Sequence, residues 1–143
     1  RQVLYVPNSG HGISDLARVA KAEGGFFQHV AGGLAHPSPG GPKMPRMKWA
    51  FRETGGKVAL RLESEPRPQS ATLWVAHSDS NDFRDSTWKE SPMKASGSAL
   101  VGEVEKPKSG RIAVFAEAEF QIGGKTFTLS TTMRVVPEVA KGK

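Results

Sequence analysis

His11 is the residue whose type and setting most readily suggest chemistry. It stands between two glycines in the stretch VLYVPNSGHGISD, residues 3–15, after a short apolar run and before a helix-like pattern. A histidine can act as a general base when a serine supplies the nucleophile and a carboxylate orients the ring. The alternative is a loop histidine whose ring is satisfied by nearby backbone. This short motif alone leaves both interpretations open.

The partners that His11 would need are missing from the sequence. A strand, a loop bearing a histidine and then a helix is how an α/β-hydrolase presents its catalytic histidine, which follows the serine and the acid in chain order. The nucleophile motif G-x-S-x-G occurs nowhere in the 143 residues, and SGSALVG, residues 96–102, has the wrong spacing. We therefore expect this chain not to be an enzyme by itself. His11 would be the base only in a longer parent, a serine hydrolase.

Acidic side chains gather in the stretch HSDSNDFRDSTWKES, residues 77–91, as they do in calcium-binding loops. The register of an EF-hand loop is absent, however. We interpret these side chains as turn-forming groups, with Asp82 or Asp85 paired with Arg84. They are Asp79, Asn81, Asp82 and Asp85.

The remaining metal and cofactor signals are weak. His29, His36 and His77 show no ligand spacing to one another. The chain contains no cysteine, which removes disulfides, thiolate metal sites and thiol nucleophiles together. We expect no metal and no cofactor.

Three tryptophans raise the question of a sugar-binding face, because flat aromatic rings offer large apolar surfaces to a ligand. Trp49 and Trp74 fall within strand patterns, so we interpret them as core residues. Phe83 and Trp88 are interpreted as packing over the edge of the β part. Sugar binding stays open as an alternative.

The composition restricts the partners. Twenty Lys and Arg residues against 14 Asp and Glu residues give a net charge of +6. The basic residues are scattered among acidic ones, so we expect no nucleic-acid partner. No apolar run approaches the roughly 18 residues that would span a membrane. The chain opens on RQVLYVP without a methionine, which we interpret as the start of an excised piece.

The first 35 residues must position His11. QVLYV is almost wholly apolar and predicts a strand buried on both faces. ISDLARVAKA predicts a helix with Ser14 as its N-cap, interrupted or restarted at Gly24-Gly25. One face of this helix is apolar and comprises Ile13, Leu16, Ala17 and Ala20. Residues 36–46 are rich in proline and glycine and predict a linker.

Residues 47–137 predict an all-β domain, and residues 138–143 a basic tail. A hairpin is indicated at Thr54-Gly55-Gly56. Further strands are ATLWVAHS, SALVGEVE and a short edge strand in STWKESP. Six or seven short strands in this length favour a β-sandwich of immunoglobulin or fibronectin type III kind.

The last two strand patterns alternate clearly. In RIAVFAEAEFQI one face comprises Ile112, Val114, Ala116, Ala118 and Phe120, and the other comprises Glu117, Glu119 and Gln121. KTFTLSTTMRVVP predicts one continuous strand. Its apolar face comprises Phe127, Leu129, Thr131, Met133 and Val135.

Three segments carry a resemblance to a known family. LYVPNSGHGI, WVAHSDSNDFRDSTW and GRIAVFAEAEFQIGGKTFTLSTTMRVVP stand in an order that resembles the C-terminal part of PhoPQ-activated pathogenicity-related proteins. The autocrine proliferation repressors belong to the same family. The resemblance implies an exported, α/β-hydrolase-like parent, and hence a periplasmic or secreted setting.

Carried over residue by residue, the resemblance gives His11 the role of the family's histidine, with Pro7 and Asn8 shaping the loop before it. The family's serine and acid have no counterpart here. The accessory sandwich would cap, orient or tether the hydrolase part. A binding module for cell-surface protein or glycan stays the alternative. The sandwich segment, whose role is taken as structural, is matched by Asp82, Phe83, Arg84 and Trp88.

The apolar surfaces of residues 1–35 have a physical consequence. In a hydrolase they would be covered by the N-terminal domain, which this chain does not contain. Here Val3, Leu4 and Val6, together with Leu16 and Ala20 on the helix, must pack on the sandwich, self-associate or fray. We expect self-association through residues 1–35, or their displacement from the position they hold in the parent.

Overall fold

A computed structural model of the chain describes residues 3–9, 12–35, 44–122 and 124–137. It contains one helix, α1 (Leu16–Ala35), followed by nine strands within these ranges. The strands are β1 (Arg46–Thr54), β2 (Lys57–Glu65), β3 (Ser70–Ser78), β4 (Lys89–Pro92), β5 (Lys94–Ser96), β6 (Ala99–Glu105), β7 (Arg111–Ile122), β8 (Lys125–Ser130) and β9 (Arg134–Pro137). The predicted mainly β class is confirmed.

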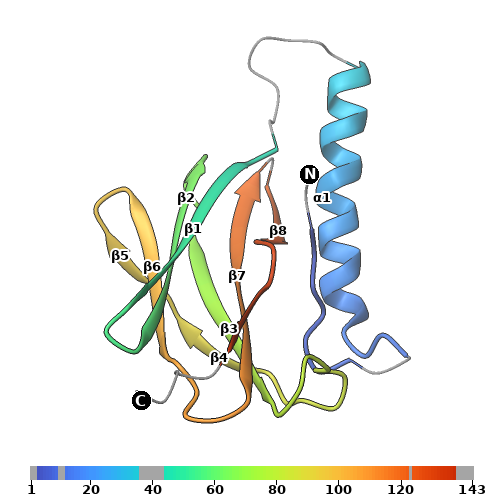
Figure 1. Ribbon diagram of the computed structural model, residues 1–143. Coiled ribbons are helices and arrows are strands. Elements are labelled where there is room, and N and C mark those ends of the chain that lie inside the picture. Colours follow the sequence, from blue (N-terminus) through green and yellow to red (C-terminus); the bar gives the residue numbers. More distant parts are fainter. Residues whose placement is uncertain (1–2, 10–11, 36–43, 123, 138–143) are drawn as a thin grey trace.

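The strands form two antiparallel sheets that face each other as a β-sandwich (Figure 1). One sheet has the order β1-β2-β6-β5. The other has the order β4-β3-β7-β8, and β9 pairs with β7 beside β8. The buried Met93 lies between β4 and β5, where the chain passes from one sheet to the other. The predicted edge strand in STWKESP is β4.

The hairpin between β1 and β2 forms where the sequence predicts it. Thr54 and Lys57 are paired, so the turn consists of Gly55 and Gly56. Both glycines have positive φ angles, 59° and 79°, which suit a two-residue turn matching the twist of the strands. At the centre of the sandwich, Gly102 on β6 lets the sheets approach, because a Cβ there would lie 3.1 Å from Leu73.

One predicted strand is in fact two. β8 and β9 pair with successive parts of β7, and the interval between them holds one more residue than the opposite interval on β7. This bulge reverses which side chains face the core. The inward direction of Val135 predicted from a continuous strand is therefore wrong. Val136 is fully buried and Val135 is 39% exposed.

The segment before α1 differs from the predicted buried strand. Within the described residues 3–7 only Val3 has a strand partner, in an isolated bridge with Ser130 at the β8 edge. Two residues further on, the Tyr5 amide donates to the Ser130 hydroxyl at 3.2 Å instead of to a backbone carbonyl. Pro7 has no amide hydrogen to continue a ladder. The segment lies between α1 and the five-stranded sheet (Figure 1).

α1 begins one residue later than predicted. Asp15, not Ser14, is its N-cap, because the Asp15 Oδ1 accepts a hydrogen bond from the Arg18 amide at 3.0 Å. The helix continues through Gly24 and Gly25 without interruption. Residues 36–43 and 138–143 lie outside the described residues, so the linker over 36–46 and the basic tail stay predictions. No helix within the described ranges combines the length and apolar character needed to cross a bilayer.

Candidate functional site

His11 lies outside the described residues, and so does Gly10. The structure describes the residues on either side of them. The Ser9 and Ser14 hydroxyls lie 2.8 Å apart, and the Ser14 amide donates to the Ser9 oxygen at 3.3 Å. The two ends of the loop that carries His11 are therefore held together by hydrogen bonds.

Asn8 fixes the start of this loop to the sandwich. Its Oδ1 accepts a hydrogen bond from the Trp88 amide at 2.8 Å, and its Nδ2 donates to the Trp88 carbonyl at 3.2 Å. The Asn8 side chain thus bonds both backbone groups of Trp88, as the backbone of a neighbouring strand would. Asn8 has a φ of 57°, a left-handed conformation that asparagine tolerates better than most residues. This pair joins two segments that are 80 residues apart in sequence.

An aromatic cluster holds the preceding residues in place. The Tyr5 ring lies 4.8 Å from Phe115 on β7, and Trp88 lies 5.2 Å from the same ring. Trp74, the neighbour of Phe115 on β3, stacks with Phe115 at a centroid distance of 6.4 Å. The Tyr5 hydroxyl also accepts a hydrogen bond from the Met133 amide at 3.3 Å. Because Phe115 is only 1% exposed, the N-terminal segment is part of its burial.

Arg18 attaches α1 to the same face of the sheet. Its guanidinium donates to Asp15 at 3.0 Å and to Glu117 on β7, and it lies 5.5 Å from the Trp74 ring centre. Burial raises the pKa of the Glu117 carboxyl above its ordinary value, and the charge of Arg18 only partly opposes this. The hydrogen bonds from Arg18 lower the pKa of Asp15. The charges of Asp15, Arg18 and Glu117 therefore influence one another's pKa values.

A cavity of about 430 Å³ opens where the N-terminal segment meets the loop before β4. Its walls are mainly aromatic and apolar, with polar groups at Asn81, Asp82 and Arg84. Phe83 and Trp88 are half-buried, as expected for residues packed over the sandwich edge. The other lining residues are Tyr5, Val6, Pro7, Phe115, Met133 and Val135.

The loop of residues 79–88 forms the turn predicted from its Asp and Ser content. Asp82 and Arg84 form an ion pair, and hydrogen bonds from Arg84 lower the pKa of Asp82 to about 2. The Asp82 amide donates to the Ser80 hydroxyl at 3.0 Å. Among the described residues, no group of three or more acidic or histidine side chains is placed to hold a metal ion.

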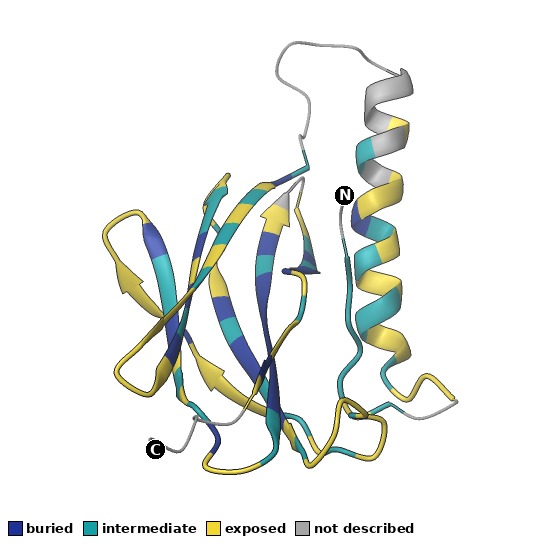
Figure 2. Cartoon of the chain, in the orientation of Figure 1, coloured by how far each residue is buried: buried dark blue, intermediate teal, exposed yellow. Residues whose placement is uncertain are grey.

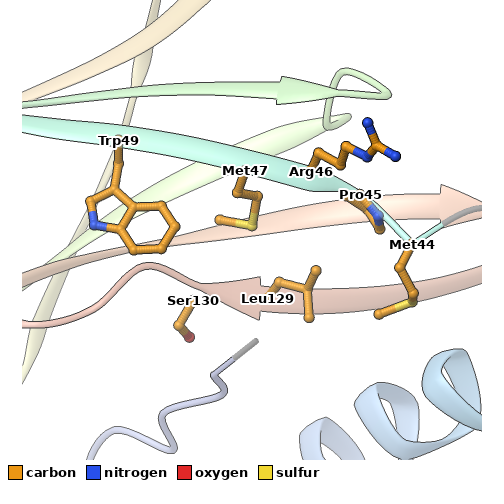
Figure 3. Close-up of a pocket in the computed structure, with 7 residues that line it drawn as sticks. All are labelled: Met44, Pro45, Arg46, Met47, Trp49, Leu129 and Ser130. Atoms are coloured by element: carbon orange, nitrogen blue, oxygen red, sulfur yellow. The ribbon is translucent and has the colours of Figure 1, made fainter. Parts of the chain in front are cut away.

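A second cavity, of about 610 Å³, opens between the edges of β1 and β8 (Figure 3). Met44, Met47 and Leu129 line it, and Trp49 closes one end. The Trp49 indole donates to the Thr132 hydroxyl at 3.2 Å, and its half-buried ring packs against the core from the edge strand β1. Trp74 is buried, but it lies beneath the N-terminal segment on the outer side of its sheet.

The pairing of Arg18 with Glu117 was not predicted from the sequence. The sequence places Glu117 on the second side of β7, together with Glu119 and Gln121. The same side carries Ala113 and Phe115, and these apolar residues were the signal that this face is covered. In the structure, both are buried and Glu117 is 9% exposed. The first half of this side is therefore covered, which the alternating pattern by itself does not reveal.

Comparison with known proteins gives one family match. The profile of a protein family described as PhoPQ-activated pathogenicity-related protein matches residues 1–84. No curated protein matches the sequence. A solved structure titled "Crystal structure of Br derivative BhCBM56" is similar at 14% sequence identity, with a TM-score of 0.47, and covers 69% of this chain and 100% of that chain. The family match runs from the N-terminal segment through α1 and β3 into the loop before β4.

Proposed function

Because the chain belongs to the family of PhoPQ-activated pathogenicity-related proteins, we propose that its β-sandwich is an accessory domain that positions the loop carrying His11. The proposal rests mainly on the pair of hydrogen bonds between Asn8 and Trp88. Only two residues, Ser9 and Gly10, separate Asn8 from His11, in a loop whose ends are joined through Ser9 and Ser14. A catalytic histidine must be held within a fraction of an ångström of its productive position.

The reaction that we propose is acyl transfer by a serine hydrolase. His11 takes the proton of a serine hydroxyl as the serine oxygen attacks an ester or amide carbonyl. It then gives the proton to the departing alcohol or amine. The serine and the acid that orients the ring come from a part of the parent protein outside this chain. The chain by itself is therefore inactive in this proposal, and it acts in the periplasm or outside the cell.

The proposal is tested in the parent protein with a fluorophosphonate probe, which labels activated serines. His11→Ala should abolish labelling. Asn8→Ala should slow it by about tenfold, because the loop keeps its residues but loses its anchor. Gln69→Ala serves as the matched control. It removes another surface amide, which donates to Gln121 at 2.8 Å, and should leave labelling unchanged.

Two outcomes contradict the proposal in different ways. Labelling that persists in His11→Ala means that the histidine is not the base. Labelling lost in His11→Ala but unchanged in Asn8→Ala means that the sandwich does not position the loop. The structural premise is checked separately by hydrogen exchange, since Asn8→Ala should speed exchange of the Trp88 amide in the isolated chain.

A second candidate function is a non-catalytic binding module for cell-surface protein or glycan. The aromatic walls and polar rim of the cavity of about 430 Å³ favour it. Trp88→Ala would then abolish binding to a glycan array or a cell surface, while Trp49→Phe, at the other cavity, would not. Absence of probe labelling in the parent together with such binding would replace the hydrolase proposal by this one.

A further inference from the structure

β1 leaves one edge of the four-stranded sheet without a partner strand. It stands first in the order β1-β2-β6-β5 and pairs only with β2. Thr54 and Lys57 close a two-residue turn, so Thr54 and every second residue before it exchange backbone hydrogen bonds with β2. The residues that alternate with them, such as Met47 and Trp49, therefore direct their N–H and C=O groups away from β2. Within the described residues, no other backbone group bonds to these outward groups.

The free edge of β1 lies beside the cavity of about 610 Å³. Figure 3 shows Met47 and Trp49 on the side of β1 that faces β8, and Arg46 on the opposite side. Met44, Met47 and Leu129 line the cavity, and methionine side chains adapt to apolar groups of different shapes. A strand added to β1 would direct every second side chain into this cavity, opposite Met47 and Trp49. The edge and the cavity together fit an extended peptide whose alternate side chains are apolar.

The outer side of β1 is basic. Arg46, Lys48 and Arg52 are exposed on this side, and none of them forms an ion pair with a described residue. Glu63, the neighbour of Lys48 on β2, is bonded to Arg61 instead. On an added strand, the side chains opposite these cations are those that alternate with the apolar ones. Acidic side chains at those positions would each meet an unpaired cation.

The described part of the chain offers no free segment of this kind. Its alternating acidic and apolar stretches belong to β6 and β7, and each of these strands is paired on both sides. A second copy does not fit either, because β1 against β1 would bring like charges together. The other strands with a free edge, β4, β5, β8 and β9, contain a single acidic residue, Glu90. The partner is therefore a different protein.

We propose that β1 binds an extended acidic segment of another protein, which adds a strand to the four-stranded sheet. The acidic side chains of this segment face Arg46, Lys48 and Arg52, and the apolar side chains between them enter the cavity. Backbone hydrogen bonds to Met47 and Trp49 supply affinity for any extended chain, and the alternate side chains supply specificity. This inference does not depend on the catalytic role proposed for His11.

The first test uses a synthetic peptide of about seven residues in which glutamate alternates with valine, matched in length to the stretch from Arg46 to Arg52. Its binding to the chain is measured by calorimetry. A peptide with lysine in place of glutamate is the control and should bind at least tenfold more weakly. Added salt should weaken binding of the glutamate peptide, because it screens the attraction. Absence of binding, or equal affinity for the two peptides, would overturn the proposal.

Two variants separate an effect of β1 from an effect of net charge. Lys48 and Lys94 are both exposed, lie on opposite edge strands of the same sheet and form no ion pair with a described residue. Lys48→Glu should weaken binding of the glutamate peptide about fivefold, because it places like charges opposite each other. Lys94→Glu changes the net charge equally and should leave binding nearly unchanged. An equal loss in both variants would contradict a site on β1.

Hydrogen exchange tests whether the peptide adds a strand. In the free chain, the amides of Met47 and Trp49 should exchange faster than those of Lys48 and Ala50, which are bonded to β2. The glutamate peptide should slow exchange of the first two amides selectively, and the added strand is refuted if it protects neither. The intact parent should bind the peptide as the isolated chain does. Binding to the isolated chain alone would mean that the parent covers this edge itself, which would exclude another protein as the occupant.

Discussion

The two sheets of the sandwich differ in what covers their outer faces. The four-stranded sheet turns Arg46, Lys48 and Arg52 of its edge strand β1 to solvent, and the side chains that alternate with them are half-buried. In the five-stranded sheet, β7 is buried on both sides from Ile112 to Ala118 (Figure 2). Its outer side lies beneath the N-terminal segment and α1. The N-terminal segment is thus the third layer over one sheet, and the other sheet has no such layer in the described structure.

This difference bears on the cooperativity of the fold. Phe115 contacts Trp74 of its own sheet and Tyr5 of the N-terminal segment. A side chain shared in this way loses most of its burial if the segment detaches. Residues 3–35 and the sandwich should therefore unfold together, although a proline-rich stretch separates them in sequence.

The largest expected difference between the two sheets comes from removing the Phe115 ring, which contacts both the five-stranded sheet and the N-terminal segment. Phe115→Ala should destabilise the chain by about 3–5 kcal/mol, because the side chain is fully buried among aromatic neighbours. Arg52→Ala, on the outer face of the other sheet, should change stability by no more than about 0.5 kcal/mol. Both values come from urea unfolding followed by tryptophan fluorescence. A loss below about 1 kcal/mol for Phe115→Ala would show that the segment contributes little to burial there.

The second prediction concerns the ionic attachment of α1. Arg18→Met leaves Glu117 buried without its cation and should cost about 2–3 kcal/mol near neutral pH. The partial exposure of Arg18 keeps this below the value for a fully buried pair. Lys21→Met, on an exposed position of the same helix, is the matched control and should be nearly neutral.

The loss in Arg18→Met should depend on pH with a definite sign. Burial raises the pKa of Glu117 above 4.5, and removal of Arg18 raises it further. A carboxyl with a raised pKa in the folded state binds its proton more tightly there than in the unfolded chain. Stability therefore falls as pH rises through this range, and the variant should fall more steeply than the wild type. An equal loss at all pH values would mean that Arg18 acts through packing alone.

The sandwich was predictable from the sequence wherever one face of a strand meets solvent. β1 and β2 alternate cleanly, and two glycines mark their turn. The direction of side chains was not predictable where both faces of a strand are covered, as in β7, or where a bulge adds a residue, as between β8 and β9. The alternation in β7 does not reveal that both of its faces are covered, because the burial of Glu117 depends on a segment almost 100 residues away. The bulge before Arg134 leaves no mark in composition, yet it reverses the direction of Val135 and Val136.

The candidate site was predictable only in part. Asn8 was expected to shape the loop before His11, and the spacing of Asp82 and Arg84 correctly predicted a local ion pair. The bond between Asn8 and Trp88 joins two loops across the fold, and no local pattern encodes such a contact. The role of His11 stays a prediction, because it depends on residues outside this chain.

The smallest expected effect is the difference in stability between alanine substitutions at two neighbouring glycines, which lie on different sides of α1. A Cβ on Gly25 would lie 2.7 Å from the ring of Phe127, which is 1% exposed and stacked on Phe120. Gly25→Ala should therefore cost about 1 kcal/mol net, since overpacking outweighs the gain in helix propensity. A Cβ on Gly24 meets nothing within 4 Å, so Gly24→Ala should stabilise the chain by about 0.5–1 kcal/mol.

This pair of glycines is a sharp control because both variants make the same chemical change at adjacent positions in one helix. Helix propensity and unfolded-state entropy cancel between them, and the side of the helix remains as the difference. Thermal unfolding should be followed at a low protein concentration, so that self-association through residues 1–35 contributes nothing to the measured stability. If both variants gained stability equally, α1 would not pack closely on β8 at Gly25, and the contact between Gly25 and Phe127 would be looser than the structure indicates.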